Sequence, residues 1–128
     1  MQRSIQHKSI CLLAFAFAMS ASCASPPKAP KAVKTVAFIT NASTDFWKIA
    51  RKGCEKADTE LTDVTVGFKT TNTGATKEQD GLIRDALDHD ADAIAISVVD
   101  PVAQKNVINQ AARSALVITQ DSDAPDSD

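Results

Sequence analysis

Between residues 35 and 119, segments with two different spacings of hydrophobic residues alternate along the chain. Four short runs are apolar almost throughout and predict buried strands, at residues 35–40, 64–69, 91–99 and 115–119. Three longer segments carry apolar residues every third or fourth position and predict amphipathic helices, at residues 45–61, 76–90 and 100–113. The predicted order of elements is therefore β-α-β-α-β-α-β.

Strands that are apolar on both faces, joined by amphipathic helices, predict an α/β fold with a parallel, doubly wound sheet covered on both sides. The crossovers should be right-handed. Two helix starts carry local signals. Thr76 and Gln79 are three apart, as in a capping box, and Asp100 with Pro101 suits a cap followed by a first turn. In the third predicted helix, Val102 is expected on the buried side.

Residues 1–22 are typical of a secretory signal peptide. The start carries Arg3 and Lys8 but no acidic residue, and residues 10–19 form an apolar run followed by small residues. The run is too short to span a bilayer as a stable helix. A buried N-terminal helix is the alternative, but it would give the basic start and the small-residue end no role.

Cys23 follows "SAS", which resembles a bacterial lipobox, so we expect cleavage before Cys23 and lipidation of its thiol. Cleavage after Ala24 by the ordinary signal peptidase is the alternative. Residues 23–34 are rich in Pro, Lys and Ala and predict an extended tether. Residues 35–128 remain for the folded part, a single small domain.

Charge and cysteine content exclude several classes of function. Without Arg3 and Lys8, twelve basic residues face sixteen acidic ones and form no basic cluster, which argues against nucleic acid as a partner. Cys54 lies in a helical context and is expected to be a buried, inert thiol. His89 stands alone, so no protein metal site is expected, and no phosphate or dinucleotide motif predicts a cofactor.

Ligands of open α/β sheets bind outside the carboxyl ends of the strands, and here all four ends are polar. The first strand leads into Asn41 and the aromatic pair Phe46 and Trp47, and the fourth leads into Asp121. Carboxylates and amides pair with vicinal hydroxyls, and aromatic rings pack on sugar C–H faces. The alternatives are an ordinary helix start for the aromatics and a solvated acidic tail for the terminal aspartates. No assembled catalytic set is present.

The segments "VAFITNASTDFWKIARKGCEKA", "TKEQDGLIRDALDHDADAIAISVVDP" and "ALVITQDSDAP" together resemble the periplasmic sugar-binding proteins of ribose-binding type. These are substrate-binding components of ABC importers and share their fold with the ligand domains of LacI-type repressors. The resemblance runs from Val33 to the last residue. It implies two α/β lobes that close on one sugar, of which this chain holds an incomplete first lobe.

The resemblance implies ligand contacts from Phe46 and Trp47, which would stack on the sugar, and from Asp121, which would bind its hydroxyls. Asn41 is a further expected contact. Ser122 and Asp123 are expected ligand-binding residues as well. Ribose-type members commonly carry an arginine after the aspartate, where this chain has Ser122 and then Asp123, so it points away from ribose itself and leaves another pentose, a hexose or a polyol.

The sequence thus predicts the N-terminal part of an exported receptor that is periplasmic or anchored to the membrane by lipid. Its expected partners are a sugar or polyol and ABC permease subunits. Alternatives are a receptor for a sensor kinase or chemoreceptor, a secreted α/β hydrolase or phosphatase, and a non-functional truncated product. The export signal argues against a repressor.

Overall fold

A computed structural model describes residues 33–127 of the chain, and the predicted signal peptide, Cys23 and nearly all of the tether lie outside these residues. Four strands alternate with three helices, as the sequence predicts. The strands are β1 (Lys34–Ile39), β2 (Val64–Lys69), β3 (Ala93–Ile96) and β4 (Leu116–Thr119). The helices are α1 (Asp45–Glu60), α2 (Thr76–Asp88) and α3 (Pro101–Ala112).

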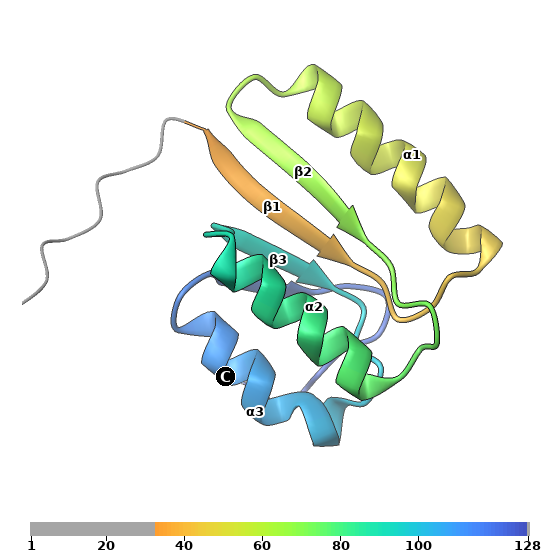
Figure 1. Cartoon of the computed structure of the whole chain (residues 1–128), viewed down its shortest axis with the longest axis vertical. Helices are drawn as coiled ribbons and strands as arrows, with labels where there is room; N and C mark the ends of the chain where they lie inside the picture. Colours follow the sequence, from red (N-terminus) through yellow and green to blue (C-terminus); the bar gives the residue numbers. More distant parts are fainter. Residues whose placement is uncertain (1–32, 128) are drawn as a thin grey trace, which may run out of the picture.

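The strands form one parallel sheet in the order β2-β1-β3-β4 (Figure 1). This order confirms the predicted parallel α/β fold. Strand β2 lies on one side of β1 and β3 on the other, so the chain reverses its direction across the sheet after β2. With right-handed crossovers, α1 therefore lies on one face of the sheet, while α2 and α3 lie side by side on the other. All four carboxyl ends meet at one edge, where β1 and β3 are central neighbours.

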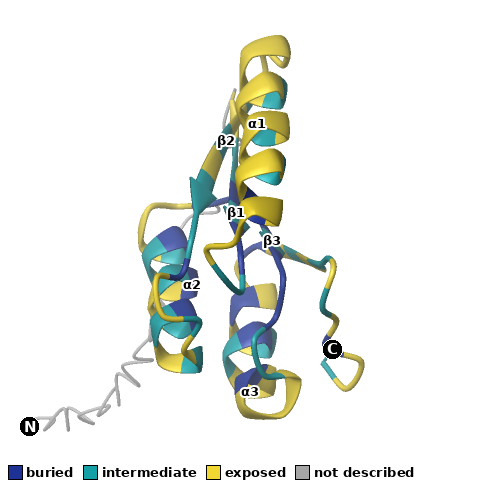
Figure 2. Cartoon of the chain, turned by 90° about the vertical axis from the view of Figure 1, so that its right-hand side faces the viewer, coloured by how far each residue is buried: buried dark blue, intermediate teal, exposed yellow. Residues whose placement is uncertain are grey.

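The core lies between the sheet and the α2–α3 layer (Figure 2). Ile39, Ile94 and Ile96 of the sheet are fully buried against Ile83 of α2 and Ile108 of α3. Successive side chains of a strand point to opposite faces. On β1 and β3, the side chains on this face therefore lie in the core, whereas Thr65 and Gly67 on the same face of β2 are exposed.

The opposite face is only partly covered by the described residues. Helix α1 packs over β1 and β2 through Trp47, whose ring lies 6.2 Å from that of Phe38. On β4, Leu116 and Ile118 remain 62% and 52% exposed. The expectation of a sheet covered on both faces holds for β1 but not for the edge strands β2 and β4 in this part of the chain.

Three local predictions met different outcomes. Asp100 is the cap of α3 and accepts hydrogen bonds from Val102 and Ala103 N–H, both at 3.0 Å, as predicted. The predicted capping box of α2 was wrong, because the N-cap residue is Ala75 and no side chain makes a capping hydrogen bond at the start of this helix. Val102, which we expected on the buried side of α3, is 83% exposed.

Cys54 is half-buried on α1 rather than fully buried, because α1 lies on the less covered face. Partial burial raises the pKa of its thiol, which favours the unreactive protonated form. None of the helices at residues 33–127 is both long and apolar enough to cross a membrane.

Candidate functional site

The candidate site lies at the edge of the sheet where the four strands end. Backbone hydrogen bonds tie the strand exits to one another. Ser97 N–H donates to Ile39 C=O at 3.0 Å, and Gln120 N–H donates to Ile96 C=O at 2.9 Å. The exits of β1, β3 and β4 therefore form one continuous platform. It lies at the edge where open α/β sheets generally bind their ligands.

Asn41 bridges two of these exits with its side-chain amide. Its Oδ1 accepts a hydrogen bond from Trp47 Nε1 at 3.0 Å, and its Nδ2 donates to Ser122 Oγ at 3.3 Å. The amide thus links α1 to the segment after β4. The structure brings Asn41, Trp47 and Ser122 together, and these contacts use much of the hydrogen-bonding capacity of Asn41 internally.

The two aromatic residues of the β1–α1 loop lie in different environments. Phe46 is 58% exposed, whereas Trp47 is only 4% exposed and packs in the interior against Phe38. The two adjacent rings meet edge to face, with centroids 4.8 Å apart. Phe46 therefore stays largely exposed to solvent, and Trp47 packs against it from the interior.

Asp121 stands directly at the exit of β4 and is exposed. Its φ angle is +63°, in the left-handed region that non-glycine residues seldom adopt. Its Oδ2 accepts a hydrogen bond from Ser97 Oγ at 2.9 Å, and Ser97 is itself fully buried after β3. The carboxylate is thus held in place from one side and open to solvent on the other. Strained backbone at such an edge is typical of functional sites.

Asp123 and Ser122 have internal partners. Asp123 Oδ1 accepts hydrogen bonds from Thr119 Oγ1 at 2.5 Å and from Ala124 N–H at 2.7 Å. The Thr119 hydroxyl, followed by the Ala124 N–H, lowers the pKa of Asp123. Ser122 C=O accepts a hydrogen bond from Val98 N–H at 3.2 Å, which fixes the β4 exit to that of β3. One carboxylate oxygen of Asp123 is therefore occupied in shaping its own turn.

The β2–α2 turn is organised by Glu78 from the first turn of α2. Its carboxylate accepts four hydrogen bonds: from the N–H groups of Asn72 and Thr73, from Asn72 Nδ2 and from Thr73 Oγ1, at 2.6–3.0 Å. These bonds, led by that of the Asn72 N–H, lower the pKa of Glu78 to about 2. Gly74 in this turn has φ +68° and lies close to Asn41 C=O.

A hollow of about 230 Å³ lies beside the site, between the start of α1 and the end of β2. The Arg51 guanidinium covers the ring of Phe68 at 4.4 Å and donates to Thr70 Oγ1 at 3.3 Å. This arrangement shields an aromatic ring at the edge strand. The hollow is lined by Ser43, Thr44, Trp47, Lys48, Arg51, Phe68 and Thr70.

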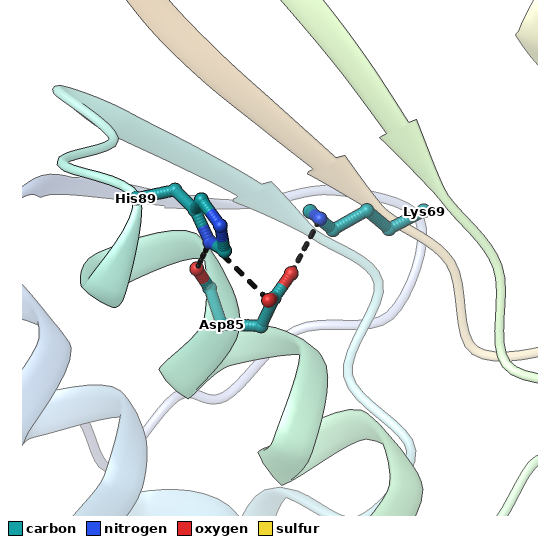
Figure 3. Close-up of polar contacts among 3 residues, drawn as sticks. All are labelled: Lys69, Asp85 and His89. Atoms are coloured by element: carbon teal, nitrogen blue, oxygen red, sulfur yellow. Dashed lines mark hydrogen bonds and ion pairs between the residues drawn. The ribbon is translucent and has the colours of Figure 1, made fainter.

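His89 lies at the end of α2, away from the platform (Figure 3). Its Nδ1 lies 2.8 Å from Asp85 C=O and 3.3 Å from Asp85 Oδ1, and Asp85 also pairs with Lys69 at 2.6 Å. The hydrogen bond from Lys69 lowers the pKa of Asp85. This half-buried ion pair joins α2 to β2. Within residues 33–127 no group of three or more acidic, histidine or cysteine side chains is placed to hold a metal ion.

Sequence reasoning missed three residues that shape the site. Ser97 orients Asp121, and the fully buried Gln79 and Gln104 bind the backbone beneath the platform. A glutamine on the apolar side of a helix was the available signal for both. The sequence interpretation paired Gln79 with Thr76 in a capping box instead.

Comparisons with known proteins agree with this geometry. The model of the periplasmic binding protein domain matches residues 36–128. A sugar-binding protein of a sugar ABC transporter from Bacillus halodurans is 34% identical, with a TM-score of 0.66 over 74% of this chain and 33% of its own. The arabinose-binding protein AraP from Geobacillus stearothermophilus is 28% identical, with a TM-score of 0.64 over 74% and 33%.

A solute-binding protein of an ABC transporter from Burkholderia graminis, in complex with D-arabinose, is 28% identical, with a TM-score of 0.64 over 76% of this chain and 34% of its own. The chain thus spans about a third of the length of these solved structures. A comparison with curated protein sequences gives no match. Because the family model covers more than half of the sequence, the chain belongs to the periplasmic binding protein domain family.

Proposed function

We propose that this chain is the N-terminal part of an exported solute-binding protein that captures a sugar or polyol for ABC-type import. It acts as a binding module and not as an enzyme. The observation that carries the proposal is the Asp121 carboxylate at the exit of β4. The Ser97 hydroxyl donates a hydrogen bond to it, and the backbone of Asp121 has a left-handed conformation. A fixed, solvent-open carboxylate is suited to accept hydrogen bonds from adjacent hydroxyls.

Phe46 supplies the second half of the recognition. Its exposed ring lies against Trp47, and Trp47 is in turn hydrogen-bonded to Asn41, so the ring sits on a rigid support. A sugar ring presents C–H groups on its faces and hydroxyls at its rim, which fits an aromatic face beside a carboxylate. The solved relatives include proteins whose titles name a sugar, which supports this class of ligand.

We further propose that the mature protein is exported to the periplasm or anchored to the membrane through lipid on Cys23. Permease subunits of an ABC importer are its proposed partners. Mass spectrometry of the mature N-terminus tests the anchor, because a diacylglycerol-modified Cys23 supports it and an unmodified residue after Ala24 contradicts it.

The first experiment reads the encoding DNA past the codon for Asp128. An open frame that continues into further strands, a hinge and a second α/β lobe supports a sugar receptor. A stop codon at that position contradicts capture between two lobes by this polypeptide.

The second experiment measures binding of a set of monosaccharides, D-arabinose included, and hydrolysis of nitrophenyl glycosides, esters and phosphates, on the protein that the frame encodes. Binding without turnover, weakened in the Asp121→Asn variant, supports a receptor. Turnover that is lost in Asp121→Asn contradicts it and indicates a secreted hydrolase. The Asp126→Asn variant is the control, since Asp126 lies in the exposed segment after the site.

A further inference from the structure

Two glutamines lie directly beneath the candidate site, and both are fully buried. Gln79 comes from α2, and Gln104 comes from α3. Gln79 Nε2 donates to Thr40 C=O at 2.9 Å and to Ser97 C=O at 2.7 Å. A single side-chain amide is therefore bonded to the exits of both central strands, β1 and β3.

The same pair also fixes the path of the chain from β3 into α3. Val99 N–H donates to Gln79 Oε1 and to Gln104 Oε1, both at 3.1 Å, and Asp100 N–H donates to Gln104 Oε1 at 3.0 Å. Gln104 Nε2 donates in turn to Asp80 Oδ1 at 2.9 Å. Every polar group of Gln79 is thus hydrogen-bonded, which is the condition under which a buried polar network specifies one geometry.

The fixed atoms belong to the residues that carry the site. Thr40 immediately precedes Asn41, and Ser97 positions Asp121 through its hydroxyl. A shift of the Thr40 or Ser97 carbonyl would move the supports of Phe46 and Asp121 relative to each other. Binding sites tolerate errors of only about 0.5 Å in such placements.

We propose that Gln79, backed by Gln104, is a positioning residue that sets the spacing between the β1 and β3 exits for ligand binding. Gln79 is buried and acts on the ligand only through the backbone that it holds. The inference rests on the proposed function, because it assigns these exits to a ligand site.

The test replaces Gln79 by methionine, which has a similar shape but neither donates nor accepts comparable hydrogen bonds. Ile83→Val and Ile83→Ala are the controls, because Ile83 is buried on the same helix one turn further on and touches no strand exit through hydrogen bonds. Of these two Ile83 variants, the one whose loss of unfolding free energy is closer to that of Gln79→Met serves as the matched control. Gln104→Met replaces Gln79→Met if the latter does not fold.

Amide NMR spectra of the chain without sugar give the first measurement. Gln79→Met should shift the amide signals of Asn41, Val99 and Asp121 and speed hydrogen exchange at Val99, whose N–H loses an acceptor. The matched control should leave these signals in place. Unchanged signals at the three residues in Gln79→Met would overturn the inference, whether or not the chain binds sugar.

A titration with D-arabinose, made on the protein that the open reading frame encodes and followed by the same amide signals, gives the second measurement. Gln79→Met should weaken binding about tenfold, as expected when one or two ligand contacts lose their geometry, and the control should change it less than about twofold. Equal weakening in both variants would overturn the positioning role. Absence of sugar-induced shifts in that protein without substitutions would count against the proposed function and leave the first measurement to decide on Gln79.

Discussion

Gly74 lies in the turn between β2 and α2, where its φ of +68° favours glycine over any other residue. A Cβ at this position would lie 3.3 Å from Asn41 C=O, closer than ordinary van der Waals contact. We predict that Gly74→Ala lowers the free energy of unfolding by roughly 1–2 kcal/mol, because both strain and contact oppose it. Urea denaturation measures this loss.

Gly81→Ala is the matched control for that experiment. Gly81 lies within α2, is exposed, and has open space where a Cβ would be built. Alanine there should raise the free energy of unfolding by up to about 1 kcal/mol through helix propensity. A stabilising effect of Gly74→Ala would contradict this prediction, because it would mean that neither the positive φ nor the contact with Asn41 C=O opposes a side chain at this position.

Glu78 gives the molecule a stability that depends on acid pH. Its pKa falls from an ordinary value of 4.5 to about 2, because the Asn72 N–H and then the Thr73 hydroxyl and N–H bind the ionised form. A carboxyl with a lowered pKa stabilises the fold fully above its unfolded pKa. That contribution is lost as the pH falls from about 4.5 through about 2.

We predict that Glu78→Gln lowers the melting temperature at pH 7 and reduces its dependence on pH between those two values. Thermal unfolding across that range measures both effects. Asp85 and Asp123 also have lowered pKa values, so the difference between variant and unmodified chain isolates the part due to Glu78. Glu55→Gln, at an exposed site on α1, serves as control. A pH dependence that Glu78→Gln leaves unchanged would contradict the role of this carboxylate.

At the scale of elements, the two faces of the sheet should differ sharply in their tolerance of substitution. Ile94 of β3 is 1% exposed within the core beneath α2 and α3, whereas Ile118 of the neighbouring β4 is 52% exposed. We predict that Ile94→Ala costs about 2–5 kcal/mol of unfolding free energy and that Ile118→Ala costs less than about 1 kcal/mol. Urea denaturation at low protein concentration measures both.

Similar costs for the two substitutions would contradict the description of the β4 face as open. Such a result would mean that Leu116 and Ile118 are covered in solution by another copy of the chain. An open sheet edge with apolar residues favours association of that kind. Repeating the measurement at several protein concentrations would separate the two cases, because only association makes the stability concentration-dependent.

The elements themselves were predictable from periodicity, because apolar runs and helical stripes report burial directly. The prediction for α2 failed at Gln79, where a local three-residue spacing suggested a cap. Tertiary contacts with the β1 and β3 exits determine the role of that residue instead. Helix α1 shows the same limit, since Ile49 lies on its apolar stripe but is 74% exposed.

The candidate site was predictable in position but not in detail. The rule that ligands bind at the carboxyl ends of parallel strands placed Asn41 and Asp121 at one edge. The sequence could not show that Trp47 points inward while Phe46 stays exposed. Adjacent residues of a helix lie about 100° apart around its axis, and the pattern does not decide which of the two aromatic residues faces the sheet. The partner of Asp121, Ser97, lies 24 residues away in the chain, and only the folded sheet brings the two together.

At the scale of the whole molecule, the site is open on the side opposite the sheet. Phe46 is 58% exposed, Asp121 is exposed, and the chain spans about a third of the length of its solved relatives. Pockets that bind small molecules well usually bury about 70–90% of the ligand surface. A platform that contacts a sugar from one side recovers only part of the free energy that association costs.

We therefore predict that this chain alone binds D-arabinose and similar monosaccharides more weakly than micromolar, or not measurably, by isothermal titration calorimetry. Closure of a second lobe over the platform, the hinge motion that the proposed receptor function requires, would supply the missing contacts. The Asp121→Asn variant is the control, since any genuine heat of binding must fall when the carboxylate is lost. Micromolar or tighter binding by the unmodified chain would contradict this prediction and show that one lobe suffices to hold the ligand.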